Sequence, residues 1–323
     1  MLDPNNPITK FKILPNGDLL TCYQSDRCKV WDLETGKLKC VLDESDNVRA
    51  LAILPNGDLV ISNHANICKV WDKKTYKLTN RSINFDSYHR RTVKQLDALA
   101  NGDIASIVDN ICKIWDLKSG NLKFTLAHND LISEIASLSN GDIITTSYDH
   151  TAKIWDPNTG QIKFILTGHN DEINMLKILP DDEIITSSRD GTIKIWNART
   201  GISKYTLEHV GSIKSLILSQ NGELIIGCES GLIKIWDLKT GQLKFTLDAH
   251  QAEIENILML ANGDIASSSW DETVKIWDSK THQLKYLLND HTLPVTALVV
   301  LPNGNLVTGS YDGTIKVWET PKD

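Results

Sequence analysis

Histidine, hydroxyl and aspartate side chains recur at fixed distances before a tryptophan, and groups of these types can do chemistry together. The histidine lies 27 residues, the serine or threonine ten residues and the aspartate six residues before the tryptophan. Taken once, such a set could supply the nucleophile, general base and orienting acid of a hydrolase. The complete sets are His128, Thr145, Asp149 and Trp155; His169, Thr186, Asp190 and Trp196; His250, Ser267, Asp271 and Trp277; and His291, Thr308, Asp312 and Trp318.

The repetition of this set favours a structural role. A reaction needs one nucleophile with one base, whereas four copies at one spacing are typical of buried polar groups that satisfy one another's hydrogen bonds. The sequence also contains no G-x-x-x-x-G-K, H-E-x-x-H or G-x-S-x-G motif, each of which would indicate a known type of catalytic or phosphate site. We therefore expect no catalytic residue, no cofactor and no metal site.

The tryptophans themselves define a repeat. Eight of them follow one another at intervals of 40 to 44 residues, from Trp31 to Trp318, and a period of this length indicates repeated supersecondary structures. Seven repeats have an Asn-Gly pair upstream of the tryptophan, and the fifth has Asp181-Asp182. Asn-Gly between apolar runs predicts a two-residue hairpin turn of type I′, because that turn needs positive φ at both central residues.

The fourth repeat shows which strands each repeat should form. Its strands are expected at Ile132–Leu138, Asp142–Ser147, Thr151–Asp156 and Ile162–Leu166. An antiparallel sheet this small cannot cover both of its faces, so such sheets stack radially. The sequence therefore predicts an all-β, eight-bladed propeller that forms one domain over residues 1–323, with repeats that end near residues 32, 72, 116, 156, 197, 237, 278 and 319.

The Trp-Asp ending, together with the repeated histidine, hydroxyl and aspartate, resembles the WD-repeat (WD40) β-propeller family. The resemblance runs from about Ile8 to Glu319 and implies that each complete set is a hydrogen-bonded tetrad inside one blade. The first two repeats lack the histidine and the aspartate, and the third retains Asp109, so we expect mainly apolar packing to hold these three blades. In the sixth repeat, Ile226 and Ser230 replace the hydroxyl residue and the aspartate together, which predicts that only the histidine there needs another partner.

The last blade is expected to lack its outer strand. Five residues follow Trp318 in the sequence, whereas the seventh repeat goes on to a fourth strand at Leu284–Leu288. We therefore predict a three-stranded last blade whose edge, Thr314–Glu319, is exposed. Unpaired edges recruit further strands, so this edge could take a strand from a partner or from a second copy of an otherwise monomeric protein.

The resemblance also implies where a partner would bind. In the family, the residue before the tetrad aspartate and the residue three after the histidine line one face around a central channel. Aromatic and arginine side chains are enriched in interface hot spots, and Trp270 lies outside the repeated tryptophan position. Aromatic faces beside carboxylates would suit a segment that carries Lys or Arg. The expected partner-binding residues are Trp270, Tyr311, Tyr148, Arg189, His64, Glu229, Glu172, Glu253 and Arg91.

Composition narrows the classes of partner. The chain has 41 acidic and 34 basic residues and a net charge of −7, which disfavours nucleic acid because phosphate binding relies on clustered Lys and Arg. No stretch approaches 18 apolar residues, and the N-terminus has no basic and apolar leader, so we expect no membrane association and a cytoplasmic location. Cys28, Cys68 and Cys112 each occupy an apolar position before a tryptophan and are expected to be free buried thiols.

Three functions remain, in order of preference. The first is a non-enzymatic scaffold or adaptor that binds protein segments or domains on the loop-bearing face. The second is a phosphopeptide-reading substrate receptor, for example in a ubiquitin-ligase-like assembly, with Arg189 and the pair Arg90-Arg91 as its basic groups. The third is an enzyme with its site in the central channel, which is least favoured because the histidines recur with the repeat and do not form one unique cluster.

Overall fold

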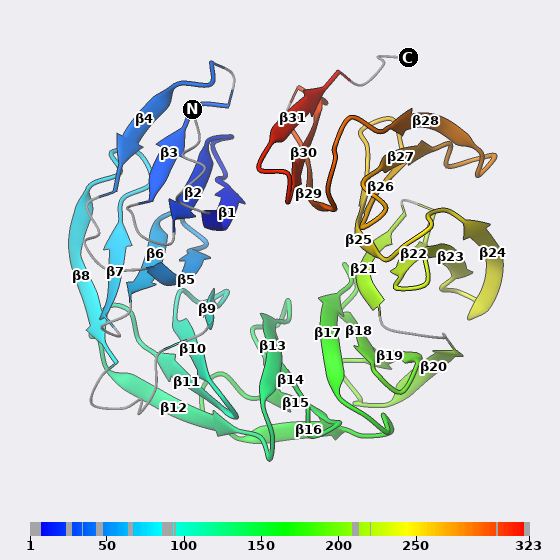
Figure 1. Ribbon diagram of the computed structural model, residues 1–323. Coiled ribbons are helices and arrows are strands. Elements are labelled where there is room, and N and C mark those ends of the chain that lie inside the picture. Colours follow the sequence, from blue (N-terminus) through cyan, green and yellow to red (C-terminus); the bar gives the residue numbers. More distant parts are fainter. Residues whose placement is uncertain are drawn as a thin grey trace. The chain divides into compact units, whose positions relative to one another are not determined.

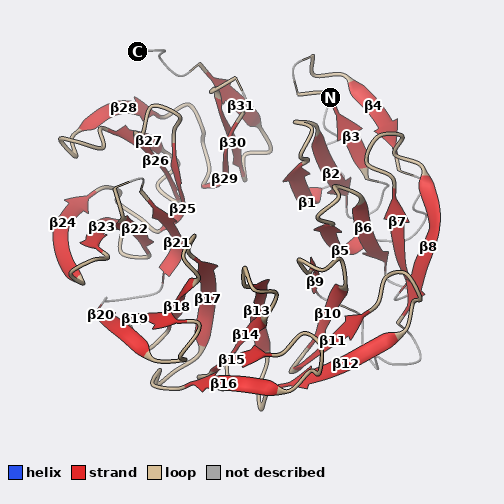
Figure 2. Cartoon of the chain, turned by 180° about the vertical axis from the view of Figure 1, so that it is seen from behind, coloured by secondary structure: helices blue, strands red, loops and turns tan. Residues whose placement is uncertain are grey.

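The computed structural model describes residues 8–23, 28–33, 35–42, 48–63, 67–85, 93, 95–208, 213–219, 221–301 and 303–319. These residues form strands and turns, with no helix among them (Figure 2). By its internal contacts the chain divides into two bodies. The first body is Met1–Ile184 with Asn197–Ile202, and the second body is Ile185–Trp196 with Ser203–Asp323.

The described strands form eight sheets, and within each sheet the strands are hydrogen-bonded in chain order (Figure 1). The first four sheets are β1 (Ile8–Ile13), β2 (Leu19–Tyr23), β3 (Lys29–Trp31), β4 (Leu38–Val41); β5 (Val48–Ile53), β6 (Leu59–Asn63), β7 (Ile67–Trp71), β8 (Leu78–Asn84); β9 (Gln95–Ala98), β10 (Ile104–Val108), β11 (Ile111–Trp115), β12 (Leu122–Ala127); and β13 (Ile132–Ser137), β14 (Ile143–Ser147), β15 (Ala152–Trp155), β16 (Ile162–Leu166). The last four are β17 (Ile173–Ile178), β18 (Glu183–Ser188), β19 (Thr192–Asn197), β20 (Ser203–Glu208); β21 (Ile213–Leu218), β22 (Glu223–Cys228), β23 (Leu232–Asp237), β24 (Gln242–Asp248); β25 (Ile254–Met259), β26 (Ile265–Ser269), β27 (Val274–Trp277), β28 (Leu284–Leu288); and β29 (Val295–Val300), β30 (Leu306–Ser310), β31 (Ile315–Trp318).

The hairpin between the first two strands of a sheet differs from the predicted turn. In the first sheet the amide of Gly17 donates to the carbonyl of Leu14, and the amide of Leu14 donates to the carbonyl of Asp18. Within this turn only Gly17 has a positive φ, of 85°. The turn is therefore a type I turn followed by a glycine bulge. The prediction of type I′ is wrong because the loop has three residues and begins at Pro15, whose fixed φ suits the first central position of a type I turn.

The apolar core of a sheet is shared with the next sheet along the chain. In the second body, Ile233 and Ile235 of β23 pack in one buried cluster with Ile254 and Ile257 of β25, the first strand of the following sheet. Trp277 of β27 belongs to the same cluster. A single four-stranded sheet could not bury these side chains alone, so successive repeats are needed to complete each core.

Two of the six cysteines do not meet the expectation of free thiols. Cys22 and Cys28 form a disulfide, and both side chains are fully buried. They face each other one step beyond the last described pair of the β2–β3 ladder, where antiparallel register brings two Cβ atoms close together. Cys68 and Cys112 are free, and burial raises the pKa of both thiols. The expectation is therefore wrong for Cys28, because its partner lies on the other strand of its hairpin.

The last sheet has three strands, β29, β30 and β31. No other strand of the described residues is hydrogen-bonded to β31. The apolar side chains of Ile315 and Val317 on this strand are exposed by 45% and 60%. The predicted three-stranded last blade is therefore confirmed for the part of the chain that the structure describes.

Candidate functional site

The histidine, threonine, aspartate and tryptophan of the fourth repeat form one hydrogen-bonded network. The imidazole of His128 lies 2.9 Å from Asp149 Oδ2 through Nδ1 and 2.8 Å from Thr145 Oγ1 through Nε2. The indole Nε1 of Trp155 donates to the same threonine oxygen at 2.8 Å. His128 precedes β13, and Asp149 lies in the loop between β14 and β15. The tetrad therefore ties together the two loops at one end of this sheet.

The aspartate, histidine and hydroxyl groups are hydrogen-bonded in the same sequence as those of a hydrolytic triad. The hydroxyl group, however, is not accessible to a substrate. Asp149 accepts the Nδ1–H of His128, which leaves Nε2 to accept the hydroxyl proton of Thr145. The hydroxyl of a serine nucleophile is held in the same way. However, the Thr145 side chain is completely buried, and its oxygen already accepts the indole N–H of Trp155. A substrate carbonyl has no path to this oxygen, so the tetrad serves to hold the sheet together.

The seventh and eighth repeats contain the same network. His250 lies 2.9 Å from Asp271 Oδ2 and 2.7 Å from Ser267 Oγ, and Trp277 donates to Ser267 at 3.0 Å. The corresponding distances in the eighth repeat are 2.8 Å for His291 to Asp312, 2.7 Å for His291 to Thr308 and 2.9 Å for Trp318 to Thr308. Geometry repeated at this spacing indicates that register within the sheet positions these side chains.

The fifth set is divided between the two bodies. His169 belongs to the first body, whereas Thr186, Asp190 and Trp196 belong to the second. Within the second body, Trp196 Nε1 donates to Thr186 Oγ1 at 2.8 Å. The bond between tryptophan and hydroxyl is therefore present in this repeat as well.

The first and third repeats keep more of the network than expected. Trp31 Nε1 donates to Thr21 Oγ1 at 2.8 Å, and Trp115 Nε1 donates to Ser106 Oγ at 2.7 Å. These two blades thus keep the bond between tryptophan and hydroxyl beside their apolar packing. Ser106 lies nine residues before its tryptophan because β10 and β11 are joined by a two-residue turn. Asp109 occupies this shorter turn with a φ of 54°, so it is not the equivalent of a tetrad aspartate.

The sixth repeat leaves one buried donor without an acceptor. Ile226 stands at the place of the hydroxyl residue, and Ser230 at the place of the aspartate. The indole Nε1 of Trp236 is buried and has no hydrogen-bond partner among the described residues. The prediction that only the histidine of this repeat needs a partner is therefore wrong. Ile226 has no hydroxyl group, so it offers no acceptor to the indole N–H of Trp236, which can only donate.

This orphan donor predicts different effects for two matched substitutions. Trp277→Phe removes the hydrogen bond to Ser267, whereas Trp236→Phe removes an N–H that already lacks an acceptor. Both tryptophans are buried, so both variants lose similar apolar contact. We expect Trp277→Phe to lower the unfolding free energy, measured by urea denaturation, by about 1–3 kcal/mol more than Trp236→Phe. Equal losses would show that the indole hydrogen bond makes no net contribution.

Burial and hydrogen bonding set the charge states of the fourth tetrad. Burial lowers the pKa of His128 because it disfavours the imidazolium, and the neighbouring Asp149 offsets this only in part. Burial alone would raise the pKa of Asp149, but hydrogen bonds from Thr151, from the amide of Asn129 and from His128 lower this pKa to about 2. At neutral pH the pair is therefore a neutral imidazole that donates to a carboxylate.

These shifts predict a loss of stability in acid. In the unfolded chain His128 has a pKa of about 6.5, above its folded pKa, so its contribution is present above about pH 6.5 and is lost as the pH falls. The folded pKa of Asp149, about 2, lies below its unfolded value of about 3.9, so its contribution is lost between about pH 4 and pH 2. We expect the unfolding free energy from urea titrations to fall below pH 6.5 and again below pH 4. Asp149→Asn should weaken the second decrease, and an unfolding free energy that is constant from pH 7 to pH 3 would contradict this.

The two kinds of loop position expected to bind the partner lie side by side. The backbone amide of the residue before the tetrad aspartate donates to the carbonyl of the residue three after the histidine. The described pairs are Tyr148 with Leu131 at 2.8 Å, Trp270 with Glu253 at 2.9 Å and Tyr311 with Pro294 at 3.1 Å. Because the tetrad fixes both loops, it also positions the surface that they form.

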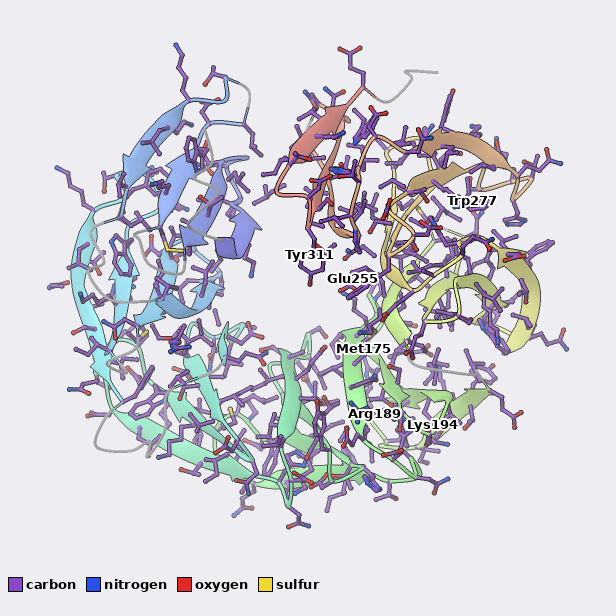
Figure 3. All side chains as sticks on the ribbon, viewed as in Figure 1. Met175, Arg189, Lys194, Glu255, Trp277 and Tyr311 are labelled. Carbon is purple, nitrogen blue, oxygen red and sulfur yellow. A yellow bond between two sulfur atoms is a disulfide. The ribbon has the colours of Figure 1, made fainter. Side chains whose placement is uncertain are left out.

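In the second body, Trp270 and Tyr311 form an exposed aromatic pair. Their ring centroids are 6.0 Å apart in an edge-to-face arrangement of 76°, and the two side chains are 43% and 64% exposed. The indole Nε1 of Trp270 donates to Glu255 Oε2 at 3.0 Å. Tyr311 and Glu255 lie on the same side of this body (Figure 3), and Glu255 belongs to β25, the first strand of its sheet. We call Trp270, Tyr311, Glu253 and Glu255 the aromatic surface.

Carboxylates give this part of the second body an excess of negative charge. Lys214 Nζ lies 3.0 Å from Glu253 Oε1. This contact, together with the nearby carboxylates of Glu255 and Glu229, raises the pKa of Lys214 despite its partial burial. The carboxylates of Glu253 and Glu255 carry two negative charges against the one ammonium group of Lys214, so the aromatic surface favours a positively charged ligand.

The other expected binding residues have different places. Tyr148 and Glu172 belong to the first body, and Arg189 is exposed in the second. His64 and Arg91 lie outside the described residues. The spacing from the histidine did not point to Glu255. Alternation along the strand could not link it to Glu253 either, because Glu253 precedes β25 and the register shifts between Ile254 and Asn256.

The described residues contain neither a metal cluster nor a membrane-spanning helix. No three His, Cys, Asp or Glu side chains in these ranges are grouped so that they could hold a metal ion. None of the same residues belongs to a helix with the length and apolar character that a bilayer requires.

Comparison with known proteins identifies the repeat. The family model of the WD domain, G-beta repeat, matches residues 36–72, 120–156, 160–197, 201–237, 241–278 and 282–319. These matches cover more than half of the chain and end at the third strands of the second repeat and of the fourth to eighth repeats. No curated protein matches the chain.

A solved structure shares the architecture. The crystal structure of the computationally designed Ika8 protein is similar to 98% of this chain and 96% of that chain, with a TM-score of 0.80 and 28% sequence identity. The eight sheets are thus blades, and the predicted all-β, eight-bladed WD40-type propeller with a three-stranded last blade is confirmed. With six matched repeats and the tetrads of its blades, this chain belongs to the WD-repeat (WD40) family.

Proposed function

We propose that this protein is a non-enzymatic scaffold that binds segments of other proteins on its aromatic surface and prefers segments that carry Lys or Arg. WD40 propellers generally bind other proteins or peptides and are generally not enzymes. The observation that supports the proposal most is the exposed pair of Trp270 and Tyr311. Exposed tryptophan and tyrosine that lie together are typical of interface hot spots.

Trp270 does not belong to the tetrad of its repeat. It lies in the loop between β26 and β27, whereas Trp277 is the tryptophan that completes the tetrad of this sheet. Its N–H group is already satisfied by Glu255. The open ring therefore offers apolar contact and a cation–π contact to a ligand, and it does not need a hydrogen-bond acceptor from the partner.

The charge of the surface supports a basic ligand. A cation over an aromatic face gains about 0.5–2 kcal/mol, and the carboxylates of Glu253 and Glu255 add electrostatic steering. The same carboxylates disfavour the alternative, a phosphopeptide receptor, because a phosphate group needs clustered arginines. Of the basic groups of that alternative, Arg189 is exposed in the second body, and Arg90 and Arg91 lie outside the described residues.

Selection from a random ten-residue peptide library displayed on phage tests the proposal. Peptides selected by the wild-type chain are expected to be enriched in Lys and Arg. Their synthetic copies should bind the double variant Trp270→Ala, Tyr311→Ala at least about 30-fold more weakly, which corresponds to one hot spot of about 2 kcal/mol. Tyr286→Ala is the matched control, since Tyr286 is also 43% exposed but belongs to the outer strand β28. It should leave the affinity unchanged.

Three results would overturn the proposal. Equal binding by the double variant, at an unchanged unfolding free energy, would exclude the aromatic surface. Selected peptides that are acidic or uncharged would exclude the preference for cations. Tighter binding of phosphorylated copies of the selected peptides would favour the phosphopeptide receptor instead.

A further inference from the structure

Seven of the eight sheets have an asparagine followed by a glycine in the turn between their first two strands. The asparagine is exposed in all seven turns, and the amide of the glycine donates to the carbonyl of the residue three before it. The seven asparagines are Asn16, Asn56, Asn101, Asn140, Asn221, Asn262 and Asn303. Because exposure and backbone hydrogen bonding are alike, the turns differ mainly in what the asparagine side chain contacts.

Five of these side chains are held by both of their polar atoms. In the seventh sheet, Asn262 Nδ2 donates to Asp264 Oδ2 at 2.9 Å, and Asn262 Oδ1 accepts the amide of Asp264 at 3.1 Å. An asparagine that bonds the residue two further on forms an Asx turn, and here the aspartate adds a charged acceptor. The same two bonds are present at Asn16, Asn56, Asn101 and Asn140.

The eighth sheet lacks the charged acceptor in this turn. Asn305 follows Gly304 at the place that Asp264 has in the seventh sheet. The amide of Asn305 still donates to Asn303 Oδ1 at 3.0 Å. Asn303 Nδ2, however, has no hydrogen-bond partner among the described residues. The side chain of Asn303 is therefore held by one bond, whereas that of Asn262 is held by two.

The sixth sheet has a glutamate, Glu223, at the same place. The amide of Glu223 donates to Ser219 Oγ at 3.0 Å and not to the asparagine. Its side chain is one carbon longer than aspartate and pairs with Lys244 on the outer strand β24. In the part of the chain that the structure describes, the side chain of Asn221 therefore has neither of the two bonds.

We propose that Asn221 and Asn303 are sites of spontaneous deamidation in the folded protein, and that the aspartates protect the other five asparagines. In this reaction the main-chain nitrogen of the glycine attacks Cγ of the asparagine. The side-chain nitrogen leaves as ammonia with the proton of the glycine amide, and a cyclic imide forms. One water molecule then opens the imide at either of its two carbonyl carbons, which gives aspartate or isoaspartate.

The side-chain hydrogen bonds oppose the first step of this reaction. The asparagine must rotate about its Cα–Cβ bond before Cγ can reach the glycine nitrogen, and this rotation breaks the bonds of the side-chain amide. The glycine itself offers no obstacle, because it has no Cβ beside its nitrogen. Asparagine is among the thermolabile residues of proteins, so a turn that holds it in place also preserves it.

Either product changes the turn in which it forms. Aspartate adds a negative charge to an exposed hairpin, and isoaspartate adds one carbon atom to the main chain. Because the type of a hairpin turn depends on its length, isoaspartate at Asn221 or Asn303 disrupts the turn between the first two strands of that sheet. The proposal concerns different residues from the aromatic surface and does not depend on it.

Incubation of the full chain in mildly alkaline buffer, followed by peptide mass spectrometry, measures the reaction at each turn. We expect Asn221 and Asn303 to deamidate at least about tenfold faster than Asn262, the factor for one hydrogen bond to a charged group. In the urea-unfolded chain the three rates should become similar. Asn305→Asp supplies the missing acceptor and should lower the ratio of the Asn303 rate to the Asn262 rate about tenfold. Asn158→Asp, which adds the same charge to another exposed turn, is the matched control and should leave this ratio unchanged.

The proposal fails on any of three results. Equal rates at Asn221, Asn303 and Asn262 in the folded chain would show that the side-chain bonds do not control the reaction. A difference of the same size in the unfolded chain would assign it to the neighbouring sequence and not to the turn. An unchanged ratio after Asn305→Asp would show that the carboxylate does not protect the asparagine.

Discussion

Gly231→Ala is expected to lower the unfolding free energy by about 2–5 kcal/mol, although it adds a single methyl group. Gly231 has a φ of 81°, and its Cβ would lie 2.2 Å from the carbonyl oxygen of His250 and 3.0 Å from that of Ala252. The left-handed backbone accounts for about 1–2 kcal/mol. The remaining loss, about 1–3 kcal/mol, comes from a clash with backbone atoms that cannot rotate away.

Gly313→Ala is the matched control for this substitution. Gly313 also lies five residues before the tryptophan of its repeat and has a φ of 79°, but no atom lies within 4 Å of the Cβ position. His150 and Glu272 adopt positive φ at the same place in two other repeats, so the backbone shape is tolerated there. We expect Gly313→Ala to cost only about 1–2 kcal/mol in parallel urea denaturation. Equal losses for the two variants would mean that the contact with His250 does not contribute.

His250→Ala and Asp271→Ala are each expected to lower the unfolding free energy by about 1–3 kcal/mol. Each substitution leaves a buried polar partner without its hydrogen bond, because His250 bonds both Asp271 and Ser267. The double variant should lose less than the sum of the two single losses, since the second substitution removes the group that the first left unsatisfied. Urea denaturation of the four proteins gives the coupling energy directly.

A second cycle serves as the control for this coupling. Asp312 belongs to the network of His291 in the next sheet and shares no hydrogen-bond partner with His250 among the described residues. The losses of His250→Ala and Asp312→Ala should therefore add. Additive losses for His250→Ala and Asp271→Ala as well would show that the two residues do not stabilise the fold as one network.

The positions of the tetrads were predictable because register is a local property. The histidine lies 27 residues before the tryptophan both at His128 and at His250, and the structure connects both through a hydroxyl ten residues before the tryptophan. Turn length and the alternation of buried and exposed residues set such offsets within a sheet. Where the turn length changes, as at Asp109 in its two-residue turn, the offset no longer identifies the equivalent residue.

The residues of the aromatic surface other than Glu255 could be predicted one by one, but the contacts between them could not. Trp270 and Tyr311 were expected because each precedes a tetrad aspartate. Their edge-to-face contact joins the loops of two successive sheets, and the acceptor that fixes Trp270 is Glu255 on β25. A spacing rule within one repeat contains no information about the distance between side chains of different repeats.

By itself the sequence determined the eight repeats, their strands and the hydroxyl partners of four of the eight repeat tryptophans, because turn residues and alternation act over a few neighbouring residues. Only the tertiary structure decided that Trp236 has no acceptor among the described residues, that Gly231 has no room for a side chain and that Cys22 pairs with Cys28. Each of these outcomes depends on atoms that another strand or the next blade brings to the site. Packing sets those distances to within fractions of an ångström, and the spacing of residues along one segment does not specify them.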